Sequence, residues 1–523
     1  MNTKEVIIVG SGIAGCSLAL ALAKRGVSVT IVTHSAMEKQ ETDTFTISQE
    51  IIESALQNFQ LKCDEKCCAR AYEQIQSCAK HSLDELFGED FFTEKKSVTC
   101  IQSYLKDQLA KFSQVEWLYK HSLIEILTLE KNSLKPSDLY KKPTCFGIRV
   151  YNHESDCLEY LLAKEVILAT GGAETLYRYQ CEQFTNGESL AIAEEAGVRL
   201  IHMDLVEFYP LALHKKGRLP YLLPLELVLD GAKFYAQDFS DISIPFSSPH
   251  QMSQEIYEVL LKNEEEFIWL DLTHLNFTEL NLKYPELEND CSKKGFNLLK
   301  DFLPVRPTAL YTCGGIAVDR TAQTNLQRLR AIGNVACTGV FYNGKSRILS
   351  LLESFTWAVS AAEDISKLVQ KLVYYFPVIK DRNESIVKKT HATYQEVCLL
   401  KNLMWNYVGI QRDLVHLKRA YSLLQELSKQ IQDDHFRELS ISNIRILLTI
   451  KIALTITKAA LDKENLHPTV RRKSPSLKFS SRTSEIEPEL HLERAKYSKI
   501  SHLYLKNMIH LMKNESHFTH DHF

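Results

Sequence analysis

The chain has 523 residues, of which 45% are hydrophobic and 24% are charged, and its formal net charge is −3. This length exceeds what one ordinary core holds, so we expect roughly two or three domains. The composition is that of a soluble globular protein, and the charge gives no reason to expect nucleic acid or membrane insertion.

Thirteen cysteines are spread over the chain. The one tight group, Cys63, Cys67 and Cys68, lacks a fourth ligand at zinc-like spacing, so we predict no metal site there. We interpret the cysteines as reduced thiols of a cytoplasmic protein.

The first residues give strand and helix signals in turn. EVIIVG (5–10) predicts a buried strand, SLALALAKRG (17–26) a helix and VSVTIVT (27–33) a second strand. Three interrupting glycines, and the absence of a small-residue cleavage site, distinguish the apolar run 6–23 from a secretory signal. The segment therefore predicts one βαβ unit.

The turn between the first strand and the helix carries Gly10, Gly12 and Gly15 in the pattern G-x-G-x-x-G. The first glycine permits a tight turn, the second lets the backbone approach a pyrophosphate, and the third lets helix and strand pack closely. We therefore predict a dinucleotide site, although a glycine-rich turn without a ligand is the alternative. Thr33 and His34 stand where a ribose-binding acid is usual, so this motif alone does not separate a flavin from a nicotinamide dinucleotide.

The segment up to residue 172 continues the α/β pattern. Residues 48–122 are mostly helical in pattern, and 131–142 form a polar, proline-containing loop. We expect strands at 145–152 and 157–172. The second ends in Ala169-Thr170-Gly171-Gly172, small residues that let a chain pass beside a dinucleotide, and an ordinary strand-end turn is the alternative.

The rest of the chain divides into an insertion, a return and a helical end. Residues 236–300 are more polar, which suits an inserted domain, and glycines with strand-like pieces return between 313 and 365. The periodicity is helical from about 390, and the apolar run 446–461 is too short and too charged to span a bilayer. We expect the basic, Ser-rich stretch 466–490 to be mobile.

These pieces, in this order, resemble the succinate dehydrogenase/fumarate reductase flavoprotein superfamily, and within it the chain is most similar to the aspartate oxidases. The stretches that carry the resemblance are VIIVGSGIAGCSLALALA (6–23), LATGGAETLY (168–177), YTCGGIAVD (311–319), SLLES-x₆-AAEDI (350–365) and LMWNYVGIQR (403–412). The resemblance covers nearly the whole chain, with poor matches at 40–150 and after 466.

The resemblance implies an α/β fold with a Rossmann-like FAD-binding domain of the two-dinucleotide-fold flavoprotein type, an inserted α+β capping domain and a C-terminal helical bundle. It places the FAD-binding domain at 1–204 and 313–371, the cap at 205–312 and the helical domain at 372–523.

The resemblance also implies a reaction. Aspartate oxidases transfer a hydride from L-aspartate to flavin, which gives iminoaspartate for quinolinate and NAD synthesis, and oxygen or fumarate reoxidises the flavin. The implied cofactor is FAD, the substrate a small dicarboxylate, and a further partner the quinolinate-forming enzyme. The cofactor-binding residues that we predict are Gly10, Ser11, Gly12, Ile13, Ala14, Gly15, Thr33, His34, Ala169, Thr170, Gly171, Gly172, Glu188, Gly314, Gly315, Asn334, Ser350 and Leu351.

The sequence departs from the family at its flavin and substrate positions. The family's flavin loop with Gln-Gly-Gly has no counterpart in TDTFTISQE (42–50). Asn334 stands where the family has a flavin-contacting Glu. Tyr209 in EFYP (207–210) and Leu310 each stand in place of a family histidine.

The candidate catalytic residues follow from the same comparison. His250 aligns with a catalytic Arg of the family, and Gly344-Lys345 aligns with its dicarboxylate clamp, with Arg347 close by. We predict that His250, Lys345 and Arg347 hold the carboxylates and that Tyr209 orients the substrate. Two alternatives stay open: a flavin dehydrogenase or reductase of another small acid, and a catalytically degenerate flavin-binding homologue.

Overall fold

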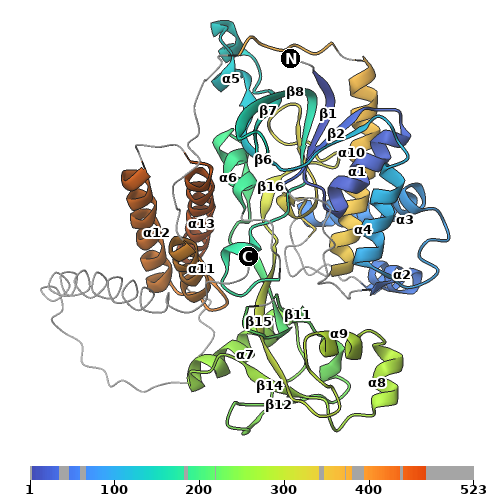
Figure 1. The fold of residues 1–523 in the computed structure, drawn as a ribbon, viewed down its shortest axis with the longest axis vertical. Coiled ribbons are helices and arrows are strands. Elements are labelled where there is room, and N and C mark those ends of the chain that lie inside the picture. Colours follow the sequence, from blue (N-terminus) through green and yellow to red (C-terminus); the bar gives the residue numbers. More distant parts are fainter. Residues whose placement is uncertain are drawn as a thin grey trace, which may run out of the picture.

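Two sheet-containing bodies and a group of helices make up the protein, which is described here by a computed structural model (Figure 1). The residues that the structure describes are 3–34, 46–58, 66–181, 187–217, 219–340, 347–371, 373–379, 394–435 and 440–466. The long strand β15 (Leu303–Thr312) connects the two sheet-containing bodies, and the C-terminal helices lie beside them.

The main sheet has seven strands, in the order β5-β2-β1-β8-β7-β6, with β17 added beside β8. Its strands are β1 (Lys4–Val9), β2 (Val29–Val32), β5 (Val115–Leu118), β6 (His121–Thr128), β7 (Cys145–Asn152), β8 (Cys157–Leu168) and β17 (Leu329–Ala331). β1 lies parallel between β2 and β8. Its Val and Ile side chains are almost fully buried, as expected for a parallel strand that is covered on both faces.

Helices cover one side of this sheet. They are α1 (Ile13–Lys24), α2 (Gln49–Asn58), α3 (Lys66–Phe87), α4 (Val98–Leu109) and α10 (Arg347–Lys371). The short strands β3 (Thr46–Ile47) and β4 (Lys96–Ser97), which flank α2 and α3 in the chain, pair as a two-stranded antiparallel sheet. α1 packs against α10, α3 and α4 as well as the sheet. A helix that is enclosed in this way must be apolar all round, which explains its Leu-Ala sequence.

The second sheet, which we call the cap sheet, has six antiparallel strands in the order β11-β10-β15-β14-β12-β13. Besides β15 they are β10 (Val206–Leu213), β11 (Tyr221–Leu222), β12 (Lys233–Tyr235), β13 (Asp241–Ile242) and β14 (Ile268–Asp271). The helical pieces around it are η3 (Leu225–Val228), α7 (Pro249–Asn263), α8 (Phe277–Lys283) and α9 (Leu287–Lys293). Most of its apolar side chains form a core of their own, whereas Val206, Phe208 and Ala309 pack in the core that the main sheet shares with the C-terminal helices.

A small third sheet lies between the two larger ones. It consists of β18 (Ala336–Cys337), β16 (Gly315–Ala317) and β9 (Leu200–Ile201), and the turn η4 (Gly333–Val335) leads into it. The remaining short pieces are α5 (Leu129–Asn132), η1 (Pro136–Tyr140), η2 (Glu174–Leu176) and α6 (Glu188–Glu195).

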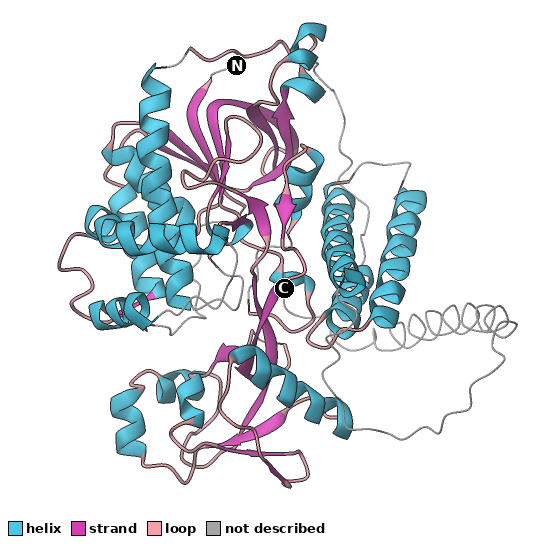
Figure 2. Ribbon diagram, turned by 180° about the vertical axis from the view of Figure 1, so that it is seen from behind, coloured by secondary structure: helices cyan, strands magenta, loops and turns pink. Residues whose placement is uncertain are grey.

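The last described helices are α11 (Tyr394–Val408), α12 (Leu414–His435) and α13 (Ile441–Leu466), which stand beside the sheets (Figure 2). α13 packs on α6, and Trp405 of α11 meets the rings of Tyr179, Phe208 and Tyr257. The helical end is therefore joined to both the main sheet and the cap sheet by side-chain packing.

The βαβ unit predicted for the N-terminus is confirmed, as are the two later strands at 145–152 and 157–172. The mostly helical pattern at 48–122 concealed β5, which pairs with β2 at the edge of the sheet. The loop at 131–142 contains the short helical turn η1, which starts at a proline. In both places the tertiary contacts decide a short element that periodicity does not resolve.

Within the described residues, no helix is long and apolar enough to cross a membrane. The stretch after Leu466 and the side chains of Cys63, Cys67 and Cys68 lie outside the described residues. The cysteines that the structure does describe are free thiols.

Candidate cofactor and substrate site

The N-terminal turn packs at distances that only glycine allows. Gly10 has φ of 115°, and a Cβ there would lie 2.2 Å from the carbonyl oxygen of Ala169. A Cβ on Gly15 would lie 2.2 Å from the carbonyl oxygen of Gly10. The turn thus brings β1, α1 and the end of β8 together without side chains between them.

Gly12 differs from its neighbours because a Cβ there would meet no atom within 4 Å. It stands at the N-cap of α1 without any side-chain cap, so the turn leaves the first N–H groups of the helix available. An uncapped helix N-terminus beside open space suits a pyrophosphate. The turn from Gly10 through Ser11, Ile13 and Ala14 therefore fits a bound dinucleotide.

The end of β2 supplies hydroxyl and imidazole groups instead of a carboxylate. Ser11 Oγ and Thr33 Oγ1 lie 2.9 Å apart in a hydrogen bond. His34 packs edge-on against His153 with ring centroids 4.8 Å apart. Burial, and then the charge of Arg445, lower the pKa of His34, so its imidazole is neutral near pH 7.

The turn after β8 carries a polar atom that has no hydrogen-bond partner among the described residues. The backbone N–H of Ala169 donates a hydrogen bond of 2.8 Å to the carbonyl oxygen of Val9, which fixes the turn against β1. Thr170 Oγ1 is buried and makes no hydrogen bond to the described residues. A buried hydroxyl without a partner is unfavourable, and its place between Ala169 and Gly171-Gly172 fits a ligand group at the cofactor site.

The Gly314-Gly315 pair allows the chain to cross the backbone of other segments. A Cβ on Gly314 would lie 2.1 Å from the carbonyl oxygen of His202, and one on Gly315 would lie 2.5 Å from that of Val335. The pair therefore lets the chain return from the cap sheet into the third sheet beside β9 and β18.

Residues at the start of α10 complete the region. Ser350 Oγ donates to Asn334 Oδ1 at 3.3 Å, and Leu351 is partly buried. A Cβ on Gly333 would lie 2.8 Å from Cβ of Ala14, so this segment touches the N-terminal turn. Burial lowers the pKa of Arg347 to about 10, and Arg347 is the first residue of α10.

Glu188 begins α6 and forms an ion pair with the C-terminal helices. Its Oε1 and Oε2 lie 2.9 and 3.2 Å from Nε of Arg445 on α13. The charge of Glu188 also acts on His34. Its assignment to the cofactor stays a prediction.

The four residues that we predict to be catalytic stand in different surroundings. The hydroxyl of Tyr209 is buried and donates to the carbonyl of Leu223 at 2.7 Å, and burial raises its pKa. His250 is an exposed residue in the first turn of α7. Lys345 lies outside the described residues, while Arg347 begins α10. The roles of these four residues stay predictions.

Leu310, at the position of a family histidine, is 5% exposed and packs in the apolar core of the cap sheet together with Tyr209. The two positions at which the resemblance implies a histidine, Tyr209 and Leu310, therefore both lie in this core.

Glu207 is a buried acid that the sequence patterns did not single out. It lies on β10 and is 7% exposed, and no hydrogen bond or charge from the described residues acts on the pKa of its carboxyl group. Burial alone raises the pKa of Glu207 to about 7. The signal in the sequence was a lone acid in the apolar strand VEFYPLAL (206–213).

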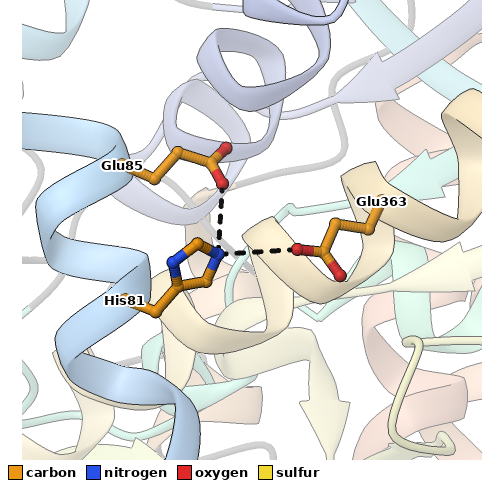
Figure 3. Close-up of side chains that lie close together, drawn as sticks. All are labelled: His81, Glu85 and Glu363. Carbon is orange, nitrogen blue, oxygen red and sulfur yellow. Dashed lines mark ion pairs between the residues drawn. The ribbon is translucent and has the colours of Figure 1, made fainter.

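A second cluster of ionisable groups joins the helices on the outer side of the main sheet (Figure 3). His81 Nε2 lies 3.7 Å from Glu85 Oε2 and 3.6 Å from Glu363 Oε1. Arg25 binds both oxygens of Glu85, with Nη2 at 2.9 Å from Oε2. Because the guanidinium already neutralises Glu85, we interpret the cluster as an ion-pair network between α1, α3 and α10.

Comparison with known proteins gives one consistent result. The FAD binding domain family matches residues 83–344, about half of the chain. The chain belongs to the FAD binding domain family. A second family, described as FAD dependent oxidoreductase, matches residues 5–44, which include the glycine turn.

Curated relatives extend the match over most of the chain. The L-aspartate oxidase of Yersinia pestis is 26% identical over 514 residues, which cover 88% of this chain and 94% of the relative. That of Acinetobacter baylyi is 25% identical over 93% of this chain and 94% of the relative. The predicted similarity to aspartate oxidases is confirmed.

Solved structures show the same fold. The FrdA chain of a mutated E. coli quinol fumarate reductase has a TM-score of 0.67 at 17% identity and covers 88% of each chain. A Mycobacterium smegmatis Sdh1 complex in the apo form has a TM-score of 0.68 at 16% identity, with 88% and 87% covered. The predicted flavoprotein fold, with its inserted cap and helical end, is therefore confirmed.

These findings make the chain an FAD-dependent oxidoreductase. The residues present fit the cofactor, because the open space at Gly12 and the unpartnered hydroxyl of Thr170 lie at the turns that border β1. FAD, when bound, supplies the acceptor for a hydride.

Proposed function

We propose that this protein oxidises L-aspartate to iminoaspartate, with reoxidation of the flavin by oxygen or fumarate. The observation that carries the proposal is the similarity to L-aspartate oxidases over about nine-tenths of the chain. In this proposal the product feeds quinolinate synthesis, and the quinolinate-forming enzyme is a partner.

The proposed site lies where the cap sheet meets the glycine-rich turns. A dicarboxylate needs cations at both ends, because charge-assisted hydrogen bonds both bind and orient carboxylates. Arg347 and Lys345 are the proposed clamp, with His250 as a further cation when it is protonated. The domain bounds that we propose are 1–204 and 313–371 for FAD, 205–312 for the cap and 372–523 for the helices.

A spectrum of the purified protein tests the proposal. The protein should be yellow, and L-aspartate added without oxygen should bleach the visible absorption band of the oxidised flavin. A yellow protein that L-aspartate leaves unbleached would exclude the reaction. D-Aspartate serves as the matched control, because it carries the same charges in the wrong geometry.

A second candidate is a flavin protein that has lost this reaction or acts on another small acid. Two observations favour it. The hydroxyl of Tyr209 donates its hydrogen bond to the carbonyl oxygen of Leu223, and Leu310 packs in an apolar core. Neither side chain therefore offers a free polar group to a dicarboxylate. Bleaching by succinate or a hydroxy acid, but not by L-aspartate, would support another substrate. A yellow protein that no acid reduces would support the degenerate homologue.

A further inference from the structure

Glu207 lies where the cap sheet joins the cofactor region. Its strand β10 starts beside the end of β15, with Val206 opposite Thr312 and Glu207 opposite Tyr311. Thr312 Oγ1 accepts a hydrogen bond of 2.9 Å from the backbone N–H of Ala173, directly after the Gly171-Gly172 turn. Glu207 is therefore one strand position away from a contact with the proposed cofactor turn.

The strand pair is irregular at this acid. The register passes from Glu207 opposite Tyr311 to Phe208 opposite Ala309, which leaves Leu310 as an extra residue of β15. Phe208 packs toward Trp405 and Tyr177. Because neighbouring side chains of a strand point to opposite faces, Glu207 is directed away from that aromatic group. Irregularities of this kind are common next to functional sites, where they re-aim a side chain.

The carboxyl group of Glu207 has no source of positive charge in the described residues. It is 7% exposed, and neither a hydrogen bond nor a charge from the described residues acts on its pKa. Burial is the one cause that raises its pKa to about 7, and the charge of no other described residue offsets it. A buried carboxylate without a partner is strongly unfavourable, and a cationic ligand would remove this penalty.

We propose that Glu207 binds the ammonium group of an amino-acid substrate, and so distinguishes an amino dicarboxylate from the same acid without nitrogen. The inference rests on the proposed function, in which cations such as Arg347 hold the carboxylates. An ammonium group supplies both the missing charge and N–H donors to Glu207. Succinate has the two carboxylates of aspartate but no ammonium, so it binds well only when Glu207 is protonated.

The experiment compares L-aspartate with succinate as ligands of the FAD-loaded protein, with its flavin reduced beforehand by dithionite so that neither ligand reacts. Calorimetry at pH 8 in two buffers of different ionisation enthalpy gives the affinity and the number of protons taken up. The wild type should bind L-aspartate without proton uptake and take up close to one proton when it binds succinate. Glu207→Gln should weaken the binding of L-aspartate about tenfold or more. It should also abolish the proton uptake that accompanies succinate binding.

The matched control is Glu226→Gln, which removes an exposed carboxylate from the same body of the protein. It should leave the affinities for L-aspartate and succinate unchanged. FAD content and circular dichroism report whether each variant is folded. The inference would be overturned if Glu207→Gln lost affinity for L-aspartate and succinate equally, or if its proton uptake with succinate equalled that of the wild type.

The two proposals fail in different ways. If wild-type protein binds neither ligand and L-aspartate does not bleach its flavin, both proposals are overturned. If L-aspartate bleaches the flavin but Glu207→Gln keeps the wild-type preference between the ligands, only the role of Glu207 is overturned.

Discussion

Arg330 and Glu207 are both almost completely buried, but in opposite electrostatic surroundings. Arg330 is 1% exposed beside β8, with Nε 3.3 Å from Glu165 and Nη2 2.5 Å from Asp364. Glu207, on the cap sheet, has no such partner within the described residues. The main sheet thus contains buried charge that is already paired, which suits a scaffold. The junction with the cap sheet contains buried charge that is not, which suits a place where a ligand arrives.

Arg306, on β15, is a second buried charged residue of the cap sheet that lacks an ion-pair partner among the described residues. It is 5% exposed, and its Nε and Nη1 have no hydrogen-bond partner in the part of the chain that the structure describes. Its guanidinium lies over the ring of Tyr179, 3.1 Å from the centroid. Burial lowers the pKa of Arg306 to about 10. The contrast between the two sheets therefore does not depend on one residue.

The largest expected effect comes from breaking the paired charge. Arg330→Met should lower the free energy of unfolding by about 3–5 kcal/mol, because it leaves Glu165 buried without its partner. Urea unfolding measures the loss. Arg320→Met is the control, since this arginine is 60% exposed and should change stability by less than about 0.5 kcal/mol. A loss below about 1 kcal/mol for Arg330→Met would remove the contrast.

The next effect separates packing from cofactor binding in the glycine turn. Gly10→Ala should lower stability by about 3 kcal/mol, because its φ of 115° and the contact with Ala169 both oppose a side chain. Gly12→Ala meets no protein atom within 4 Å, so it should leave the FAD-free protein as stable as the wild type. It should nevertheless weaken FAD binding, which flavin fluorescence of the released cofactor measures. Equal destabilisation by both variants would contradict this assignment.

The third prediction concerns the unpaired charge and has a defined pH range. Burial raises the pKa of Glu207 to about 7 from the usual 4.5, so the unfolded chain ionises first and the folded state loses stability as pH rises between these values. Glu207→Gln carries no ionisable group, so in the ligand-free protein it should gain about 2–3 kcal/mol of stability at pH 8. It should gain nothing at pH 4.5. Urea unfolding at both pH values checks this, and a gain that does not depend on pH would contradict it.

The smallest effect belongs to a charge pair that water reaches. Arg445→Met removes the partner of Glu188, but side-chain exposures of 34% and 17% limit the loss of stability to about 1 kcal/mol or less. The same change should raise the pKa of His34, because the charge of Arg445 lowers it. Burial is the larger cause and remains, so the rise should be partial. NMR titration of the His34 ring checks this, and a fall in its pKa would contradict the geometry.

Much of the fold was predictable from local sequence. The glycine spacing at Gly10, Gly12 and Gly15 implied a turn between strand and helix, because few other residues permit such close backbone contacts. The resemblance to aspartate oxidases supplied the order of domains and the cofactor. Short elements such as β5 were missed, since four residues give too little periodicity to distinguish an edge strand.

The candidate site was predictable only in part. Thr170 was expected at the cofactor, and the structure adds that its hydroxyl has no hydrogen-bond partner in the described part of the chain. The hydrogen bond from the Tyr209 hydroxyl to the carbonyl oxygen of Leu223 was not predictable, because the two residues are 14 positions apart and meet across the cap sheet. The same holds for Leu310, which sequence comparison placed at a histidine position but whose packing in the apolar core depends on the register of β15.

Tight backbone turns and buried segments could be located from the amino-acid order alone, because glycine conformations and apolar patterns act over a few neighbouring residues. The partners of the buried charges, in contrast, depend on the folded arrangement of the sheets. Arg330 is paired with Glu165, 165 positions away in the chain, while Glu207, opposite Tyr311 on β15, has no charged partner among the described residues. Electrostatic energy depends on distances in space rather than along the chain, so the difference between these two residues appeared only once the sheets were assembled.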